Sequence, residues 1–379
     1  MRAVDEHFMR LALRLARRGV GSTSPNPTVG AVLVKNGDIL GRGRTAPVGG
    51  PHAEIQALRD AERRRQKTQG ASLYVTLEPC CTHGRTPPCT DAITGAGIKR
   101  VIVGATDPNP MHSGRGFAVL KRSGVEVVSN VLSEKCSEMN EAFNHWIVHR
   151  TPFVTVKAAM TLDGKIATAS GESKWITGEK ARAYGMKLRQ ASDAILVGIN
   201  TVLADDPSLT VRTKRGGNAA KPIRRVVLDS LARTPLDAMI VTDEHARLTT
   251  IVVSRHAPKH RVMALAKRVK VLVAPTRNSQ ARDSKCQIDL RWLLRKLGAE
   301  EVTSLLVEGG GEVNASFLLG SFAHRVAFFY APRIVGGHNA RKAVGGTGLL
   351  QLADAIKLQN VAWRSVGHDL FLTARVKAE

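Results

Sequence analysis

Hydrophobic and polar positions in the first 150 residues alternate between helical and strand-like spacing. Apolar residues recur at helical spacing within residues 5–18, which predicts an amphipathic helix. Apolar runs within 28–42 flank Asn36-Gly37, a dipeptide that accepts the positive φ angles of a type I′ turn, so a hairpin is predicted. Further helices are predicted at 52–65, 89–96 and 117–122, and further strands at 73–77, 100–104 and 125–128. This succession predicts a layered α/β domain.

The hydrophobic pattern restarts at Pro152. Because 379 residues are long for one hydrophobic core, we predict two domains, 1–148 and 149–379. The predicted strands of the second domain, with helices between several of them, are 153–159, 194–198, 225–228, 250–254, 269–274 and 304–307. The segment from Lys214 to Lys221, which contains Gly216-Gly217-Asn218, is predicted to be a surface loop.

The net charge narrows the choice of partners. The chain has 56 Lys and Arg residues against 32 Asp and Glu residues, a formal charge of +24, which favours anionic partners such as nucleic acid, a membrane surface or phosphorylated metabolites. Only 4% of the residues are aromatic and the basic residues are scattered, whereas single-strand binding usually needs stacking platforms. No apolar run approaches the ~18 residues of a membrane span. We therefore expect a basic but merely solvated surface, with no nucleic-acid partner and no membrane span.

The cysteines indicate a reducing compartment. Their number is odd and no secretory leader is visible, which argues against a disulfide framework and favours free thiols in the cytoplasm. The five cysteines are Cys80, Cys81, Cys89, Cys136 and Cys286.

One group of residues has the composition of a catalytic metal site. His52-Ala53-Glu54 opens a predicted helix, Cys80 follows a predicted strand, and Cys89 opens the next helix. One imidazole and two thiolates leave the fourth tetrahedral position of a zinc ion open for water, whose pKa zinc lowers to roughly 7. Glu54 is then a proton carrier and not a ligand, as in the H-x-E and cysteine pattern of nucleobase deaminases.

Two alternatives to a catalytic zinc are open. The zinc could be structural, with Cys81 as fourth ligand, or His52 and the cysteines could simply be packed without a metal. Adjacent cysteines rarely reach one tetrahedral ion together, and a structural site would leave Glu54 without a role. The eight residues between Cys80 and Cys89 exceed a C-x-x-C spacing and include Arg85, which we expect to face an anionic group of the substrate.

Several segments distributed over both predicted domains resemble the bifunctional deaminase-reductase family of riboflavin biosynthesis. They are Pro25–Gly30, Gly50–Glu54, Tyr74–Cys80, Gly84–Cys89, Asp107–Pro110, Gly171–Thr177 and Asn200–Arg212. The resemblance implies an α/β protein in which a three-layer domain similar to cytidine deaminase precedes an α/β domain similar to dihydrofolate reductase. It also implies one Zn²⁺ ion in the first domain, NADPH in the second, and a homo-oligomer, either a dimer or a tetramer.

The same resemblance implies two consecutive reactions on one substrate. The first is the hydrolytic deamination of 2,5-diamino-6-(5-phosphoribosylamino)pyrimidin-4(3H)-one to 5-amino-6-(5-phosphoribosylamino)uracil. The second is the NADPH-dependent reduction of the ribosyl group to ribityl. A polynucleotide deaminase with an accessory basic domain, and a regulator that only senses ligands of the flavin pathway, are the competing hypotheses.

In the second domain a strand ends at Glu308 and runs through Gly309-Gly310-Gly311 into a predicted helix. Such a turn can bind an anion with its bare backbone, although most glycine-rich turns are only turns. The cofactor contacts implied by the resemblance are Ala159, Trp175, Thr201, Asp205, Ser230, Gly310, Gly311, Glu312, Val313, Asn314, Ala315 and Ser316. The implied substrate contacts are Ser173, Arg189, Leu209, Arg212 and Glu308.

Simpler roles are open for three of these residues, namely core packing for Leu209, packing for Trp175 and a solvated helix face for Arg189. Asp205 and Lys157 are candidates for proton delivery to the opened ribose. The chain also departs from the expected family pattern at three positions. Thr45 and Thr82 stand where we expect histidine, and Cys81 stands where we expect serine.

Overall fold

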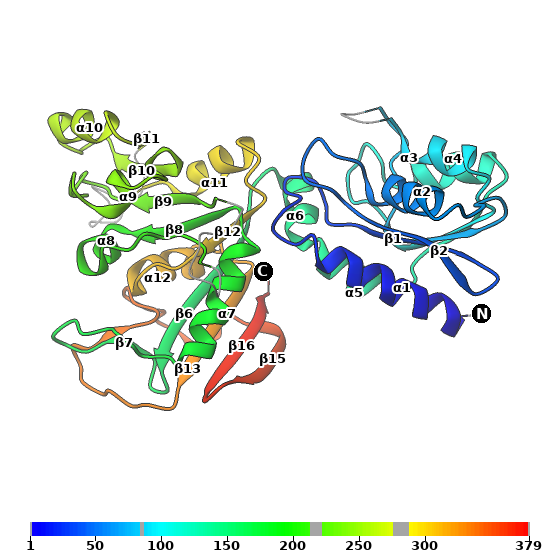
Figure 1. Ribbon diagram of the computed structural model, residues 1–379. Helices are drawn as coiled ribbons and strands as arrows, with labels where there is room; N and C mark the ends of the chain where they lie inside the picture. Colours follow the sequence, from blue (N-terminus) through cyan, green and yellow to red (C-terminus); the bar gives the residue numbers. More distant parts are fainter. Residues whose placement is uncertain (1, 84–86, 213–221, 276–287, 378–379) are drawn as a thin grey trace. The chain divides into compact units, whose positions relative to one another are not determined.

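A computed structural model describes residues 2–83, 87–212, 222–275 and 288–377 (Figure 1). Within it the chain divides into two compact units, unit 1 from Met1 to Arg150 and unit 2 from Thr151 to Glu379. Arg85 and the predicted loop from Lys214 to Lys221 lie outside the described residues. None of the helices in the described ranges has both the length and the apolar character needed to cross a bilayer.

Unit 1 is a three-layer arrangement around a five-stranded sheet of order β2-β1-β3-β4-β5. Figure 1 shows α1 and α5 on one face of this sheet and α2, α3 and α4 on the other. The hairpin strands pair antiparallel, β3 pairs antiparallel with β1, and β3, β4 and β5 run parallel. The elements are α1 (Arg2–Arg17), β1 (Gly30–Lys35), β2 (Asp38–Arg44), α2 (Ala53–Arg63), β3 (Ser72–Leu77), α3 (Cys89–Gly95), β4 (Arg100–Ala105), α4 (Arg115–Arg122), β5 (Glu126–Val128), α5 (Ser133–Met139) and α6 (Glu141–His149).

Close backbone packing positions the start of α2. Strands β1, β3 and β4 are almost continuously buried, because helices cover both faces of the sheet. A Cβ atom added to Gly43 of β2 would lie 2.0 Å from the carbonyl oxygen of Ala53, the first residue of α2. Gly43 therefore allows β2 to approach the helix end that carries His52 and Glu54.

Unit 2 is built on a nine-stranded sheet of order β11-β10-β9-β8-β12-β6-β13-β16-β15. In this sheet order, each pair of neighbouring strands from β11 at the edge to β13 is parallel. Strand β16 runs antiparallel to both of its neighbours, β13 and β15. Strand β14 pairs with β7 in a separate two-stranded sheet. The strands are β6 (Phe153–Thr161), β7 (Lys165–Ala167), β8 (Ala194–Gly198), β9 (Arg224–Leu228), β10 (Thr249–Ser254), β11 (Lys270–Ala274), β12 (Ser304–Val307), β13 (Arg325–Ala331), β14 (Arg341–Lys342), β15 (Leu358–Val366) and β16 (Asp369–Val376).

The helices of unit 2 connect these parallel strands. They are α7 (Glu179–Gln190), α8 (Ile199–Asp205), α9 (Met239–Thr242), α10 (Lys259–Ala266), α11 (Leu290–Ala299) and α12 (Gly311–Leu319), with short 3-10 turns η1 (Ala246–Leu248) and η3 (Leu352–Asp354). Two hydrophobic clusters cover the faces of the central strands, one around Leu196, Leu293 and Phe317 and the other around Ile195 and Val227.

The predicted elements are present in both units, with ends that differ by up to three residues. Helices α5 and α6 of unit 1 were not predicted. In unit 2 the small β7–β14 sheet and the strands β13, β15 and β16 at one side of the large sheet were not predicted either. Strand β15 has no buried residue along its length, so it carries none of the alternation of burial from which strands are predicted.

Candidate functional site

Three potential metal ligands converge in unit 1. The Nδ1 atom of His52 and the Sγ atoms of Cys80 and Cys89 lie within 4.8 Å of one another. The His52 Nδ1 atom is 3.3 Å from Cys89 Sγ and 3.5 Å from Cys80 Sγ. His52 immediately precedes α2, Cys80 follows β3, and Cys89 is the first residue of α3. One nitrogen and two sulfurs are a donor set that suits zinc, and they leave a fourth position open.

The two sulfurs differ in their protonation. Hydrogen bonds from the Cys89 thiol and from His52 lower the pKa of Cys80 well below the ordinary value of a thiol. The Cys89 backbone N–H also donates to Cys80 Sγ at 3.4 Å. The pKa of Cys89 is raised because its proton is donated to Cys80. The surroundings of Cys80 therefore favour the thiolate, the form in which cysteine binds a metal.

Cys81 does not belong to this group of donor atoms. Burial and the nearby Glu78 and Cys80 charges raise the pKa of its thiol, which disfavours the thiolate. The geometry therefore does not support the alternative of a closed four-ligand site that includes Cys81.

Glu54 lies in the first turn of α2 and only 4% of it is exposed. Burial is the largest cause that raises the pKa of its carboxyl group to about 7, the charge of Cys80 adds to the rise, and His52 opposes it. A carboxyl group with a pKa near neutrality both accepts and donates protons readily, which is what a general acid-base group requires. Glu54 is therefore suited to carry protons beside the three ligands.

Glu78, which was not predicted as a site residue, holds the loop from Asp107 to Gly116 against the segment that follows β3 and carries Cys80. Its buried carboxylate accepts hydrogen bonds from the backbone N–H groups of Asp107 (3.2 Å), Gly114 (3.0 Å) and Gly116 (2.9 Å). A Cβ atom on Gly116 would lie 2.3 Å from the carbonyl oxygen of Pro79. The loop from Asp107 to Gly116 is thereby held against the residue that precedes Cys80. The signal that the sequence offered was an acidic residue directly after a predicted apolar strand.

The two threonines that replace expected histidines have different surroundings. Thr45 is buried, and its hydroxyl accepts a hydrogen bond from the Val29 backbone N–H at 3.0 Å. Thr82 is exposed, and its hydroxyl lies 3.5 Å from Nδ1 of His112, which belongs to the loop held by Glu78. An imidazole is therefore present beside Thr82, although it comes from another segment.

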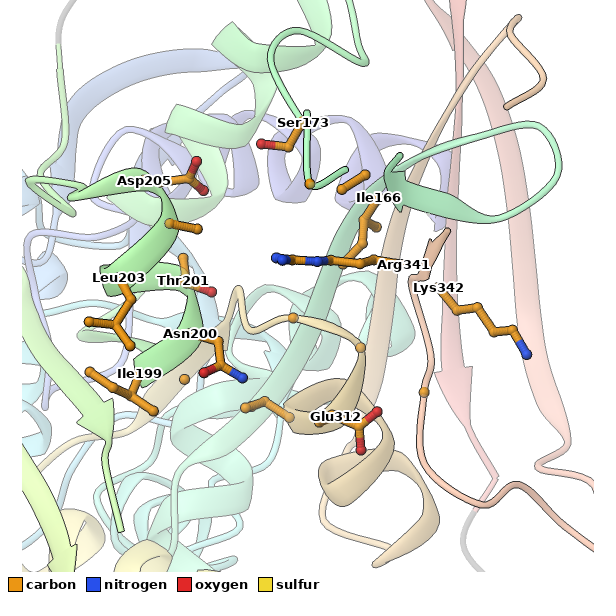
Figure 2. Close-up of a pocket in the computed structure, with 18 of the residues that line it drawn as sticks. Ile166, Ser173, Ile199, Asn200, Thr201, Leu203, Asp205, Glu312, Arg341 and Lys342 are labelled. Atoms are coloured by element: carbon orange, nitrogen blue, oxygen red, sulfur yellow. The ribbon is translucent and has the colours of Figure 1, made fainter. Parts of the chain in front are cut away.

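Unit 2 contains a main cavity of about 980 Å³, drawn in Figure 2. The glycine turn before α12, helix α8, and the short strands β7 and β14 surround it. The predicted contact residues that line this main cavity are Ser173, Thr201, Asp205, Ser230, Gly310, Gly311, Glu312 and Val313. A second cavity of about 700 Å³, the far cavity, shares Leu228, Ser230, Glu312 and Gly346 with it and adds Ala315 and Ser316.

Three predicted cofactor residues are not among the lining residues of these two cavities. Ala159 lies on β6 and packs beside Phe329 and Phe371. Trp175 is 64% exposed, and the guanidinium of Arg182 stacks 4.6 Å from its ring centroid. Asn314 is buried in α12 and donates a hydrogen bond to the Ala343 carbonyl at 2.8 Å.

The predicted substrate residues Arg189 and Glu308 form a buried ion pair. Arg189 Nε and Nη2 lie 3.0 and 2.8 Å from the two carboxylate oxygens of Glu308, and Lys157 Nζ is 3.8 Å from the same carboxylate. Burial would raise the pKa of Glu308, but the charges of Arg189 and Lys157 outweigh it and hold the pKa at about 2. Arg189 is thus not on a solvated helix face.

The other two predicted substrate residues lie on the segment after α8. Arg189 Nη1 donates to the carbonyl of Thr210 at 3.0 Å, which ties this segment to α7. Leu209 is buried in the hydrophobic cluster with Val197 and Val211, and its backbone φ angle is 49°. Arg212 is exposed.

Asn200 and Arg341 also line the main cavity, although neither was predicted as a contact residue. Asn200 is the second residue of α8, just beyond the carboxyl end of the parallel strand β8, where polar residues often face a ligand. Arg341 lies in the short strand β14, far along the chain from α8 and β7, and the sequence of this strand carries no motif.

Comparisons with known proteins agree with this division. The model of the cytidine and deoxycytidylate deaminase zinc-binding region matches residues 2–105, and the RibD C-terminal domain matches residues 152–372. The riboflavin biosynthesis protein RibD of Actinobacillus pleuropneumoniae is 45% identical over 97% of this chain and 94% of its own length. The RibD protein of Aquifex aeolicus is 41% identical over 98% of both chains.

Solved structures lead to the same family. Acinetobacter baumannii RibD is 33% identical, covers 100% of both chains and superimposes with a TM-score of 0.85. A diaminohydroxyphosphoribosylaminopyrimidine deaminase/5-amino-6-(5-phosphoribosylamino)uracil reductase from Thermotoga maritima is 36% identical over 99% of both chains, with a TM-score of 0.83. The predicted fold class, a cytidine deaminase-like domain followed by an α/β reductase domain, is confirmed. The chain belongs to the RibD family of riboflavin biosynthesis proteins.

Proposed function

We propose that this chain is a bifunctional enzyme of riboflavin biosynthesis, with its deaminase in residues 1–148 and its NADPH-dependent reductase in residues 149–379. The first reaction removes the 2-amino group of 2,5-diamino-6-(5-phosphoribosylamino)pyrimidin-4(3H)-one, and the second reduces the ribosyl group of the product to ribityl. The observation that carries the proposal is the convergence of His52 Nδ1, Cys80 Sγ and Cys89 Sγ beside the buried Glu54. The RibD relatives, which this chain matches along nearly its whole length, do not favour a polynucleotide deaminase.

The deaminase chemistry follows from these four residues. Zinc, when held by His52, Cys80 and Cys89, supplies Lewis acidity that lowers the pKa of water to about 7. Glu54 takes the two protons that the attacking water loses and delivers one to the ring nitrogen and one to the amino group. The amino group leaves as ammonia and a carbonyl replaces it, so atoms and charges balance. A carboxyl pKa near 7 suits a group that must bind and release protons within one turnover.

The reductase chemistry takes place in unit 2. NADPH, when bound, supplies a hydride to C1′ of the opened ribosyl group, and the adjacent nitrogen gains a proton. The backbone of Gly310-Gly311 opens α12 beside the main cavity and favours phosphate groups. The Arg189–Glu308 pair holds the segment that carries Leu209 and Arg212 through the Thr210 carbonyl. Asp205, which lines the cavity, and Lys157 are the candidates for delivering the proton.

The decisive experiment supplies the diaminopyrimidine phosphate with and without NADPH and identifies the products by mass. Without NADPH we expect ammonia and the deaminated phosphoribosylaminouracil. With NADPH we expect the ribityl product and stoichiometric NADPH oxidation. Ligand binding without ammonia release or NADPH oxidation would support the regulator hypothesis, and inosine formation in transfer RNA would support the polynucleotide deaminase.

We also infer that the chain forms a homo-oligomer through strand β15. This strand is the last in its sheet, and its neighbourhood exposes Val361 (47%), Trp363 (57%) and Leu370 (43%). An exposed apolar edge strand is a template for pairing with another strand, here of a second copy. Light scattering should give a multiple of the 40.9 kDa chain mass, and Val361→Lys should shift it toward the monomer. A wild-type monomer at micromolar concentration would contradict this inference.

A cytoplasmic location belongs to the same proposal. The thiols of Cys80 and Cys89 must stay reduced to act as ligands, which a reducing compartment ensures.

A further inference from the structure

We propose that Arg341 binds the diphosphate of the nicotinamide dinucleotide in the main cavity of unit 2. The proposal rests on the reductase function proposed above and assigns a role to a residue that no sequence motif singled out. It follows from three features: where the backbone holds Arg341, where its side chain points, and which anion fits there.

The backbone around Arg341 is attached to the glycine turn before α12. The Gly345 N–H donates to the Gly311 carbonyl at 3.0 Å, and the Asn314 side chain donates to the Ala343 carbonyl at 2.8 Å. A Cβ atom on Gly311 would lie 2.3 Å from the Lys342 carbonyl oxygen, so the two segments are in backbone contact. On its other side Arg341 pairs with Ala167 of β7. Arg341 is therefore held across the cavity from α8.

The side chain of Arg341 points into the main cavity. Figure 2 shows its guanidinium extending toward Thr201, whereas the neighbouring Lys342 extends away from the cavity. A Cβ atom on Gly171 would lie 3.4 Å from Arg341 Nη2, so the guanidinium passes close to a residue without a side chain. Within the ranges that the structure describes, the guanidinium of Arg341 has neither a hydrogen bond nor an ion-pair partner. Its donors are thus available to a ligand.

The cavity favours a diphosphate as that ligand. A guanidinium presents a planar fork of donors that matches two phosphate oxygens, and the start of α12 adds backbone N–H groups with positive electrostatic potential. The main cavity continues into the far cavity through shared residues, so an elongated ligand fits, and the start of α12 lies where the two cavities meet. Arg291 lines the far cavity, and its guanidinium could pair with a further phosphate group there. A dinucleotide with a central diphosphate meets these conditions.

The test compares Arg341→Gln with the matched control Lys342→Gln, which removes the same charge one residue away. Isothermal titration calorimetry measures Kd for NADPH and for NADH with each full-length variant. We expect Arg341→Gln to raise both Kd values by the same factor, about 10- to 100-fold, because hydrogen bonds to charged groups are the strong ones. Lys342→Gln should leave both values unchanged. Unchanged ammonia release by each variant confirms that unit 1 has folded, and a wild-type circular dichroism spectrum and melting temperature confirm the fold of the whole chain.

Three results would overturn the assignment. A loss confined to NADPH would place Arg341 at the 2′-phosphate, which NADH lacks. A raised KM for the phosphoribosyl substrate with unchanged dinucleotide Kd values would place it at the substrate phosphate. Wild-type affinity of Arg341→Gln for both dinucleotides would remove any phosphate role. In contrast, a wild-type chain that binds neither dinucleotide would refute the reductase function itself.

Discussion

Replacing Glu54 with Gln is expected to lower the rate of ammonia release at least ~100-fold while leaving reduction of the deaminated intermediate unchanged. Gln keeps the size of the side chain and cannot carry the proton, and Glu54 is not among the three converging ligand atoms. Bound zinc, measured by elemental analysis, should therefore stay at the wild-type level. The two activities are measured separately, one by ammonia release and the other by NADPH oxidation with the deaminated substrate.

Cys89→Ser is the contrasting variant, because it replaces one of the three converging donor atoms with an oxygen. We expect it to lose both zinc and deamination. Wild-type zinc content in Cys89→Ser would refute the ligand set. Equal loss of deamination and reduction in Glu54→Gln would contradict separate sites in the two units.

Replacing Glu308 with Gln is expected to have the largest effect on the reductase. The substitution leaves the buried Arg189 without its carboxylate partner, and breaking a buried ion pair in this way typically costs about 3–5 kcal/mol of unfolding free energy. Because Arg189 also holds the Thr210 carbonyl, the segment with the predicted substrate contacts should loosen. We expect NADPH oxidation to fall at least ~100-fold, as for loss of a group that positions the reactants, with deamination unchanged.

The pH dependence of stability provides a second measurement for Glu308. Its folded-state pKa of about 2 lies below the ordinary value of 4.5, so its charged form stabilises the fold above pH 4.5. That contribution should decline as the pH falls from 4.5 toward 2, and Glu308→Gln should lack this part of the decline. Glu179→Gln, at an exposed position of α7, is the matched control with little expected effect. Wild-type stability and reductase activity in Glu308→Gln would contradict the structural role of the pair.

Much of the deaminase centre could be predicted from the sequence because its parts are local. His52 and Glu54 are two residues apart at a helix start, and Cys80 and Cys89 flank a strand-to-helix connection. Hydrophobic periodicity identified the strand and helices that carry these residues, and the donor types indicated the metal. The same reasoning found the glycine turn at the start of α12, since a strand, glycines and a helix follow one another directly.

Burial and long-range contacts could not be predicted in this way. Nothing near Glu54 in the sequence shows that it is 4% exposed, although this burial raises its pKa to about 7. Glu78 has its role only because the loop from Asp107 to Gly116 folds back onto its carboxylate. Strand β15 was missed because an exposed edge strand has no buried face to create an alternating pattern.

The sequence by itself determined the two-part α/β organisation, the candidate metal donors with their candidate acid-base partner, and the position of the glycine turn before α12. The tertiary structure alone decided that Arg189 and Glu308 pair in the interior and that Arg341 reaches the cavity from a segment distant in the chain. The physical reason is the range of the interactions. Helix starts, turns and ligand spacing depend on residues that are neighbours in the sequence. Burial, ion pairing and cavity shape depend on packing between distant segments, and the local sequence of one segment does not indicate which other segment it contacts.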